Sequence, residues 1–244
     1  MKGGIIIQPN ANAEKATSSV INTILVLGAM WGIFEATVGY LLHLLPVSTG
    51  WIVWYPVACF FMADTYLKAH KASAILCVAF LSAGIKLFNL FFQIRIDKVL
   101  NPSVSIIFEA ISMFCVVYLL QKLPEKLRKK PFTKAFTVIG MNTGWRILYI
   151  LYILFLVPKW IRDISVISSS QQLTRFILID NLATSAAIFL AYWAVTPVLR
   201  YVNRIGKICK NVLRPVSEIL SVNKVKIAAV SLLICTDIAL QMLL

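Results

Sequence analysis

The chain is a succession of long apolar segments separated by short polar ones. Each apolar segment approaches the roughly 20 residues that a helix needs to cross a bilayer. Prolines, polar residues or basic clusters lie between the segments. The pattern predicts spanning helices at residues 20–45, 51–68, 72–93, 103–121, 133–157, 174–199 and 225–244.

Helices are expected because lipid cannot satisfy main-chain polar groups, and the alternating pattern of a membrane barrel is not present. The sequence therefore predicts an all-α, polytopic membrane helix bundle with six to seven transmembrane helices. In this interpretation, residues 1–18 are a cytoplasmic tail and residues 19–204 a six-helix transmembrane bundle. Residues 205–222 form a basic amphipathic cytoplasmic helix, and residues 223–244 form the seventh transmembrane helix.

Composition agrees with this interpretation. Hydrophobic residues make up 59% of the chain, whereas soluble domains average about 45–50%. The five cysteines form no CxxC pair, and there are only two histidines. We therefore expect no disulfide framework, no metal site and no cofactor.

Basic residues are distributed unequally between the two sides of the predicted bundle. Seventeen Lys and Arg residues fall on the side of the N-terminus, five on the other side and two within spans. The positive-inside rule then places the N-terminus in the cytoplasm of a protein integral to the cell (inner or cytoplasmic) membrane. The net charge of +14 is explained by contact with anionic lipid headgroups, so no nucleic-acid partner is expected.

Residues 200–222 have apolar positions at helical spacing and basic residues on the other face. This pattern is typical of a helix that lies on the inner leaflet. A docking surface for a cytoplasmic or membrane partner is the alternative.

Polar residues interrupt five of the predicted spans at a spacing that turns them toward one face of each helix. A charge at the bilayer centre costs about 2.5 kcal/mol or more, so such residues are usually paired or functional. With the orientation given above, most of them lie in the outer half of the membrane. The candidate binding residues are Glu35, His43, Lys86, Asn89, Glu109, Asn142, Arg146, Tyr149, Asp180 and Asn181.

These residues allow two interpretations. The three carboxylates could neutralise Lys86 and Arg146 in buried pairs that only fix helix packing. Alternatively, they line a polar cavity that opens outward and binds a small polar or amphipathic molecule, with Trp145 and Tyr149 as flat walls. The second interpretation also explains the additional Asn, Ser, Thr and His residues, although the charge of the ligand stays open.

The first span carries Gly28, Gly32 and Ala36 at four-residue intervals. Such a ridge of small residues lets another helix approach closely. We therefore assign these three residues to an interface with a partner helix.

Motifs for catalysis and nucleotide binding do not occur. HExxH, GxSxG, Walker A and GxGxxG are all missing, so no catalytic residue is assigned and no known loop binds ATP. Active transport would draw its energy from a partner or from an ion gradient.

The size of the chain, the ridge of Gly28, Gly32 and Ala36, and the outer-half polar site over residues 19–204 resemble the substrate-binding (S) components of energy-coupling-factor transporters. The resemblance implies a vitamin-type ligand in an outward pocket and a transmembrane partner that works with ATPase subunits. The seventh span and the basic helix before it depart from the usual six-helix pattern of that family.

Three functions follow from these features. The first is a solute-binding transport subunit whose partners are a small molecule, membrane lipids, and other membrane and ATPase subunits. The second is an intramembrane enzyme on a lipid-linked or isoprenoid substrate, with Glu35 and His43 or Glu109 as acid and base. The third is an assembly subunit of a larger membrane complex, in which the buried charges merely pair.

Overall fold

The computed structural model describes residues 11–44, 50–91, 96–163 and 165–193, with the side chains of 11–16, 40–44 and 51 excepted. The predicted basic helix 205–222, the predicted seventh helix 223–244 and the side chain of His43 lie outside the described residues. Within them the structure contains helices and no strand. The predicted all-α class is thus confirmed for this part of the chain.

Six long helices and several short ones make up the described chain. The helices are α1 (Ala11–Leu44), α2 (Trp51–Ala69), α3 (Ser73–Leu87), α4 (Asp97–Lys122), α5 (Glu125–Arg128), α6 (Pro131–Leu156), α7 (Lys159–Arg162) and α8 (Ser170–Thr174). A 3₁₀ turn, Phe88–Phe91, extends α3. A π-helical segment, Arg175–Ile179, continues α8 into one helix that reaches Trp193, and we call Ser170–Trp193 the 170–193 helix.

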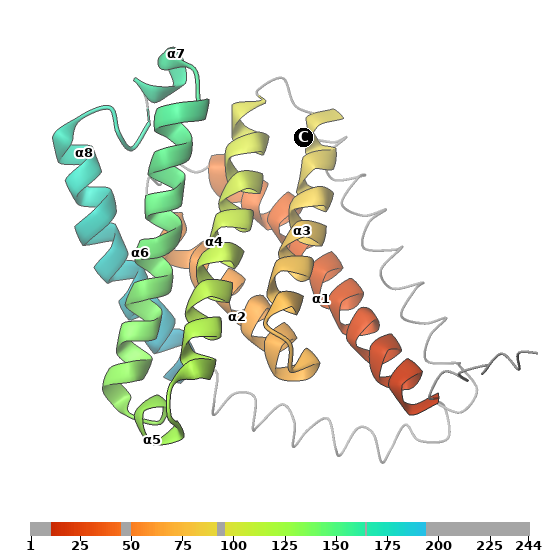
Figure 1. Ribbon diagram of the computed structural model, residues 1–244. Coiled ribbons are helices and arrows are strands. Elements are labelled where there is room, and N and C mark those ends of the chain that lie inside the picture. Colours follow the sequence, from red (N-terminus) through yellow and green to blue (C-terminus); the bar gives the residue numbers. More distant parts are fainter. Residues whose placement is uncertain (1–10, 45–49, 92–95, 164, 194–244) are drawn as a thin grey trace, which may run out of the picture.

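The long helices form a bundle in which neighbours along the chain are not always neighbours in space. α3 lies between α1 and α4, and α6 follows α4 on the other side. α2 lies behind this row and contacts α1, α3 and α4 (Figure 1). The α7 turn and the start of α4 are at one end of the bundle, and α5 is at the opposite end. We call these the α7 end and the α5 end.

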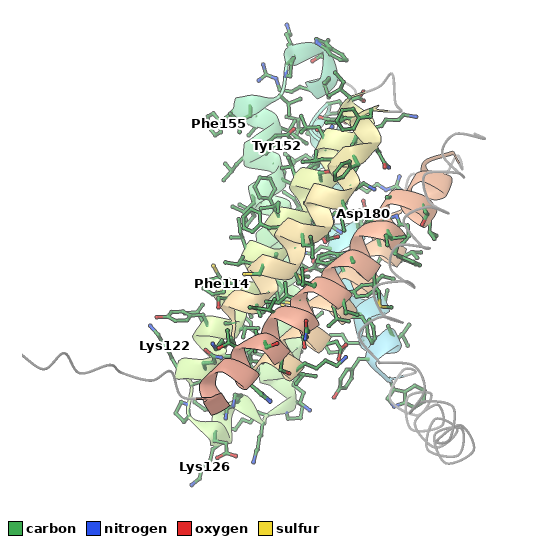
Figure 2. The ribbon with its side chains drawn as sticks, turned by 90° about the vertical axis from the view of Figure 1, so that its right-hand side faces the viewer. Phe114, Lys122, Lys126, Tyr152, Phe155 and Asp180 are labelled. Atoms are coloured by element: carbon green, nitrogen blue, oxygen red, sulfur yellow. The ribbon has the colours of Figure 1, made fainter. Side chains whose placement is uncertain are left out.

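Within the residues that the structure describes, five helices are long and apolar enough to cross a membrane. They are Thr17–Gly39, Ser73–Phe91, Asp97–Lys122, Pro131–Leu156 and Ser170–Trp193. Large apolar side chains such as Phe80, Phe155 and Leu190 are exposed on the outside of the bundle. Figure 2 shows such side chains projecting along its whole length. An exterior of this kind suits lipid better than water.

α2 does not belong to this group of five, although the sequence predicts a span at 51–68. Pro56, Asp64 and Lys68 lower its mean hydropathy. Asp64 and Lys68 form an ion pair on the outside of the helix, at 2.6 Å. One face of α2 is nevertheless part of the core, with Tyr55 and Met62 almost fully buried.

Two helices begin earlier than the sequence pattern predicts. α1 begins at Ala11, within the predicted tail 1–18, and α4 begins at Asp97 and includes Pro102. Pro102 lies in the second turn of α4, so its missing N–H removes one main-chain hydrogen bond, to the carbonyl of Lys98. Because the lost bond is near the start of the helix, the helix accommodates it. The Asn101-Pro102 pair, from which the sequence predicts a loop, is therefore helical.

The ridge of small residues on α1 packs against α3 of the same chain. A Cβ atom at Gly28 would lie 2.8 Å from Leu81 Cδ2, and one at Gly32 would lie 2.8 Å from Ile85 Cβ and 3.1 Å from Ser82 Cα. The structure therefore assigns this close approach to an intramolecular helix pair. The sequence predicts an interface with a partner helix at Gly28, Gly32 and Ala36. In the structure, α3 already covers Gly28 and Gly32.

Substitution of Gly32 by Ala tests this contact. The new methyl group would force α1 away from the main chain of α3, and such overpacking costs about 1–3 kcal/mol. Gly84→Ala is the matched control, because a Cβ at that exposed helical position meets nothing within 4 Å. It should stabilise the protein by about 0.5–1 kcal/mol. Denaturant unfolding of the purified variants in detergent measures both effects, and equal stabilities would contradict the packing.

Candidate functional site

A cavity of about 570 Å³ opens among the helices near the α7 end. It lies between α1, α2, α4, α6 and the 170–193 helix. Its volume is in the range of small-molecule binding sites, about 300–1,000 Å³. The residues that line it are Glu35, Gly50, Trp54, Tyr55, Asp97, Lys98, Asn101, Pro102, Ser105, Ile106, Glu109, Tyr149, Ile161, Ser165, Val166, Gln172, Arg175, Phe176 and Asp180.

α4 contributes the largest part of this wall. Its lining residues recur every three or four positions, from Asp97 through Asn101 and Ser105 to Glu109. This spacing places them on one face of the helix, one above another. The wall is thus polar along α4 from the mouth of the cavity at Asp97 inward to Glu109.

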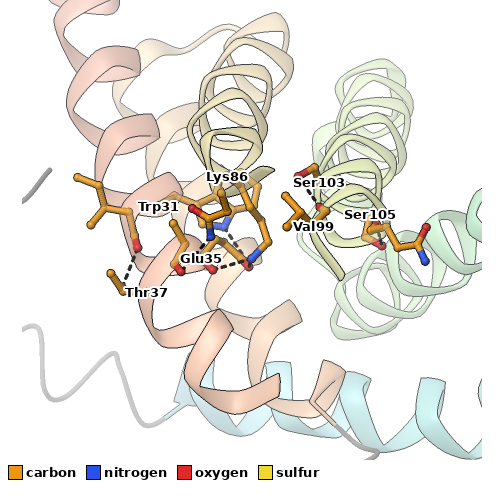
Figure 3. Close-up of polar contacts among 11 residues, drawn as sticks. Trp31, Glu35, Thr37, Lys86, Val99, Ser103 and Ser105 are labelled. Atoms are coloured by element: carbon orange, nitrogen blue, oxygen red, sulfur yellow. Dashed lines mark hydrogen bonds and ion pairs between the residues drawn. The ribbon is translucent and has the colours of Figure 1, made fainter. Parts of the chain in front are cut away.

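Glu35 lies on the cavity wall and is held by two neighbours. The Trp31 indole N–H donates to Oε1 at 3.3 Å, and Lys86 Nζ lies 3.5 Å from Oε2. Lys86 also donates to the main-chain carbonyl of Glu35 at 2.6 Å. Figure 3 shows Trp31 and Lys86 converging on Glu35 between α1 and α3. The carboxylate is therefore already neutralised, and the contact joins the two helices.

Gly39 leaves room for this ion pair. A Cβ atom there would lie 3.2 Å from Lys86 Nζ and 3.3 Å from Glu35 Oε2. Asn89, one turn beyond Lys86, donates to the carbonyl of Ala36 at 3.3 Å. Lys86 and Asn89 together satisfy two carbonyls of α1.

Glu109 has no such partner. Glu109 is 8% exposed and lines the cavity. It forms no hydrogen bond or ion pair with any other described residue. The buried hydroxyl of Tyr55, on the same cavity, also lacks a hydrogen-bond partner within the described part of the chain. Buried polar groups are normally satisfied. The cavity wall therefore includes a carboxylate, Glu109, without a hydrogen-bond partner among the described residues, and a tyrosine whose hydroxyl is closed to solvent.

Arg146 is 1% exposed and is held by neutral groups. Its guanidinium donates to the carbonyls of Phe176 (2.9 Å) and Asp180 (3.2 Å), to Thr184 Oγ1 (3.1 Å) and to Asn142 Oδ1 (3.2 Å). It also lies over the rings of Trp145 and Phe176, 4.8 and 4.5 Å from their centroids. No ion pair joins it to a carboxylate in the part of the chain that the structure describes.

The π-helical segment explains how Arg146 finds these acceptors. Within Arg175–Ile179 main-chain bonds run from i to i+5, so one carbonyl loses its usual partner. The carbonyl of Phe176, within this segment, and that of Asp180, directly after it, both accept a hydrogen bond from Arg146. This contact fixes the turn that carries three cavity residues, Arg175, Phe176 and Asp180.

Asp180 and Arg175 form a weaker pair at the cavity wall. Arg175 Nε lies 3.7 Å from Asp180 Oδ1, and the Arg175 side chain is 55% exposed. Such a partly exposed pair is worth about 0–1 kcal/mol. Asp180 thus keeps much of its capacity to interact with a molecule in the cavity.

The predicted site residues divide into two groups. Glu35, Glu109, Tyr149 and Asp180 line the cavity. Lys86, Asn89, Asn142, Arg146 and Asn181 make contacts between helices instead. Trp145 does not line the cavity either; its buried indole donates to Asn142 Oδ1 at 2.9 Å. The binding of a ligand by any of these residues stays a prediction.

Several lining residues were not among the candidates. Asp97 and Lys98 lie on a stretch that the Asn-Pro pair assigned to a loop, and Arg175 lies at the start of a span. Trp54 and Tyr55 fit an interfacial aromatic belt equally well. Asp97 could have been assigned to the site from its spacing, because it precedes Asn101 by four residues and so continues the polar face of α4.

Within the described residues, no three His, Cys, Asp or Glu side chains are arranged to hold a metal ion. Comparisons with protein-family models, with curated proteins and with solved structures find no match to this chain. Function is therefore argued from the cavity itself.

Lys86→Met tests the pair with Glu35. Removal of one member of a buried ion pair leaves the other uncompensated and costs about 3–5 kcal/mol. The double variant Glu35→Gln/Lys86→Met, which buries no net charge, should recover most of this loss. Denaturant unfolding in detergent measures the cycle. If the single variant is no less stable than the double variant, the pair does not neutralise Glu35.

Arg146→Lys tests whether the planar guanidinium is required. Lysine keeps the charge but cannot reach all four acceptors, so we expect a loss of about 1–3 kcal/mol in unfolding free energy. Arg128→Lys, the same change on an exposed residue of α5, should alter stability by no more than about 0.5 kcal/mol. A fully stable Arg146→Lys protein would argue against the described geometry.

Proposed function

We propose that this protein is a transport subunit of the cell (inner or cytoplasmic) membrane that binds a small polar or amphipathic solute. The observation that carries the proposal is the cavity near the α7 end, whose buried Glu109 lacks a partner among the described residues. Structural charges alone are expected to pair, as Glu35 and Lys86 do. A buried, unpaired carboxylate on a cavity wall is typical of a binding site.

The proposal includes six to seven spanning helices and a cytoplasmic N-terminus. α2 would be the additional span within residues 19–204, since its 19 residues nearly match the bilayer thickness. Basic residues cluster at the α5 end, where Figure 2 labels Lys122 and Lys126. By the positive-inside rule this end faces the cytoplasm, and the cavity at the α7 end then opens outward.

Transport against a gradient requires an energy source from outside the chain, because the sequence has no nucleotide-binding loop. A partner with ATPase subunits, as in the energy-coupling-factor transporters that the chain resembles, would supply it. Since α3 covers Gly28 and Gly32, the partner would contact another surface of the bundle.

A second candidate is an intramembrane enzyme that acts on a lipid-linked or isoprenoid substrate. The observation in its favour is that Glu35 and Glu109 line one cavity, so an acid and a base could face the same substrate. In that case a Glu35→Gln variant would lose product formation, whereas a transport subunit would lose uptake or retained solute.

The transport proposal predicts that the tagged chain copurifies with ATPase subunits from its own membrane and retains a small molecule in native mass spectrometry. Asn101→Trp should narrow the cavity mouth and lower retained solute by about tenfold or more, since site affinity depends on fit. Cys115→Trp introduces the same side chain on the exposed face of α4 and should leave retention unchanged.

An empty chain that copurifies with no ATPase subunit would contradict the transport proposal. Equal retention by the Asn101→Trp and Cys115→Trp variants would show that the solute binds elsewhere.

A further inference from the structure

We infer that the cavity takes a protonated amine carried on an aromatic or other apolar body, with Glu109 as its counter-ion. This inference rests on the proposed solute-binding function and names the class of solute. The sequence alone left the charge of the ligand open, because it could not show which carboxylates were already neutralised.

Neither of the two buried cations, Lys86 and Arg146, forms an ion pair with Glu109 in the described part of the chain. Lys86 is 3% exposed and bound to the side chain and carbonyl of Glu35. Arg146 is surrounded by oxygen acceptors and two aromatic rings. Neither residue lines the cavity.

The lining charges are predominantly acidic. Glu35, Asp97, Glu109 and Asp180 line the cavity, against Lys98 and Arg175. Both of these cations are exposed, so solvent screens them. Glu109 thus has no ion-pair partner among the described residues, and the buried Arg146 acts on it only at longer range.

An uncompensated carboxylate in a buried site is costly, and a bound cation removes that cost. Tyr55 also lines the cavity within electrostatic range of Glu109. Its buried hydroxyl, which has the thiol of Cys59 as a neighbour, has no oxygen or nitrogen partner among the described residues. The N–H groups of an alkylammonium can donate to the carboxylate and to the hydroxyl together. A quaternary ammonium has no N–H donor and would leave both oxygens without hydrogen bonds.

Aromatic rings supply the rest of the site. Trp54, Tyr55, Tyr149 and Phe176 line the cavity, and ring faces attract cations at close range. They also bury an apolar body. Phe176 already carries Arg146 on one face, so Trp54 and the two tyrosines are the rings available to the ammonium group.

The test uses the full-length protein in detergent or nanodiscs at about pH 7, where alkylamines are protonated. Calorimetry compares phenethylamine and tryptamine with 2-phenylethanol, 3-phenylpropionate and phenyltrimethylammonium. We expect the two amines to bind at least about tenfold more tightly than the other three probes. Glu109→Gln should weaken amine binding about tenfold or more, and Tyr55→Phe by a smaller factor of about three.

Glu125→Gln is the matched control, because it removes a carboxylate from an exposed residue of α5 and should leave amine binding unchanged. The apparent melting temperature of each variant checks its folding. If Glu109→Gln fails to fold, Tyr55→Phe and the probe series still decide the question.

Three results would overturn the inference. They are equal or tighter binding of 3-phenylpropionate, amine binding that Glu109→Gln leaves intact, and no amine binding up to millimolar concentration. Cavity binding of a neutral or anionic solute would overturn the amine assignment and leave the proposed transport function standing. Loss of the transport function would instead appear as an empty chain without ATPase subunits.

Discussion

The structure of the cavity wall depends on the hydrogen bonds of Arg146, which bind the main chain of two lining residues, Phe176 and Asp180. This buried guanidinium joins α6 to the 170–193 helix through two main-chain carbonyls and Thr184, and Asn142 of α6 also accepts a hydrogen bond from it. In a low-dielectric interior these bonds are strong, and each unmade one would be costly. Because the acceptors lie in and beside the π-helical segment, the positions of Phe176 and Asp180 on the cavity wall depend on this residue.

The same requirement for satisfied charges separates structural residues from those available for binding. Lys86 and Glu35 neutralise each other between α1 and α3, and Arg146 is stabilised mainly by hydrogen bonds to neutral oxygen atoms. Glu109 is left with no partner among the described residues, on a wall that also carries an unsatisfied Tyr55 hydroxyl. The groups that can bind a ligand are therefore the polar side chains that the contacts between helices leave without a partner.

The helices could be predicted well from sequence because apolar length and the 3.6-residue period are local properties of the chain. The same period indicated that Glu35, Glu109 and Asp180 face inward. The pairing of cations with carboxylates could not be predicted, because it depends on how the helices are rotated against one another. The sequence did not predict the helical start of α4 before Pro102, because an Asn-Pro pair usually indicates a loop. It did not predict the π-helical segment either, because no local sequence pattern indicated it.

Gly39 lies beside the ion pair of Glu35 and Lys86, so the space available to this pair depends on the residue at position 39. A Cβ atom there would crowd both Lys86 Nζ and Glu35 Oε2, so the absence of a side chain at one position sets the room for an ion pair between two helices. The effects of substitutions at positions 35, 39 and 86 are therefore expected to depend on one another. A side chain at position 39 would require the ends of Lys86 and Glu35 to shift by a few tenths of an ångström, which would strain their ion pair.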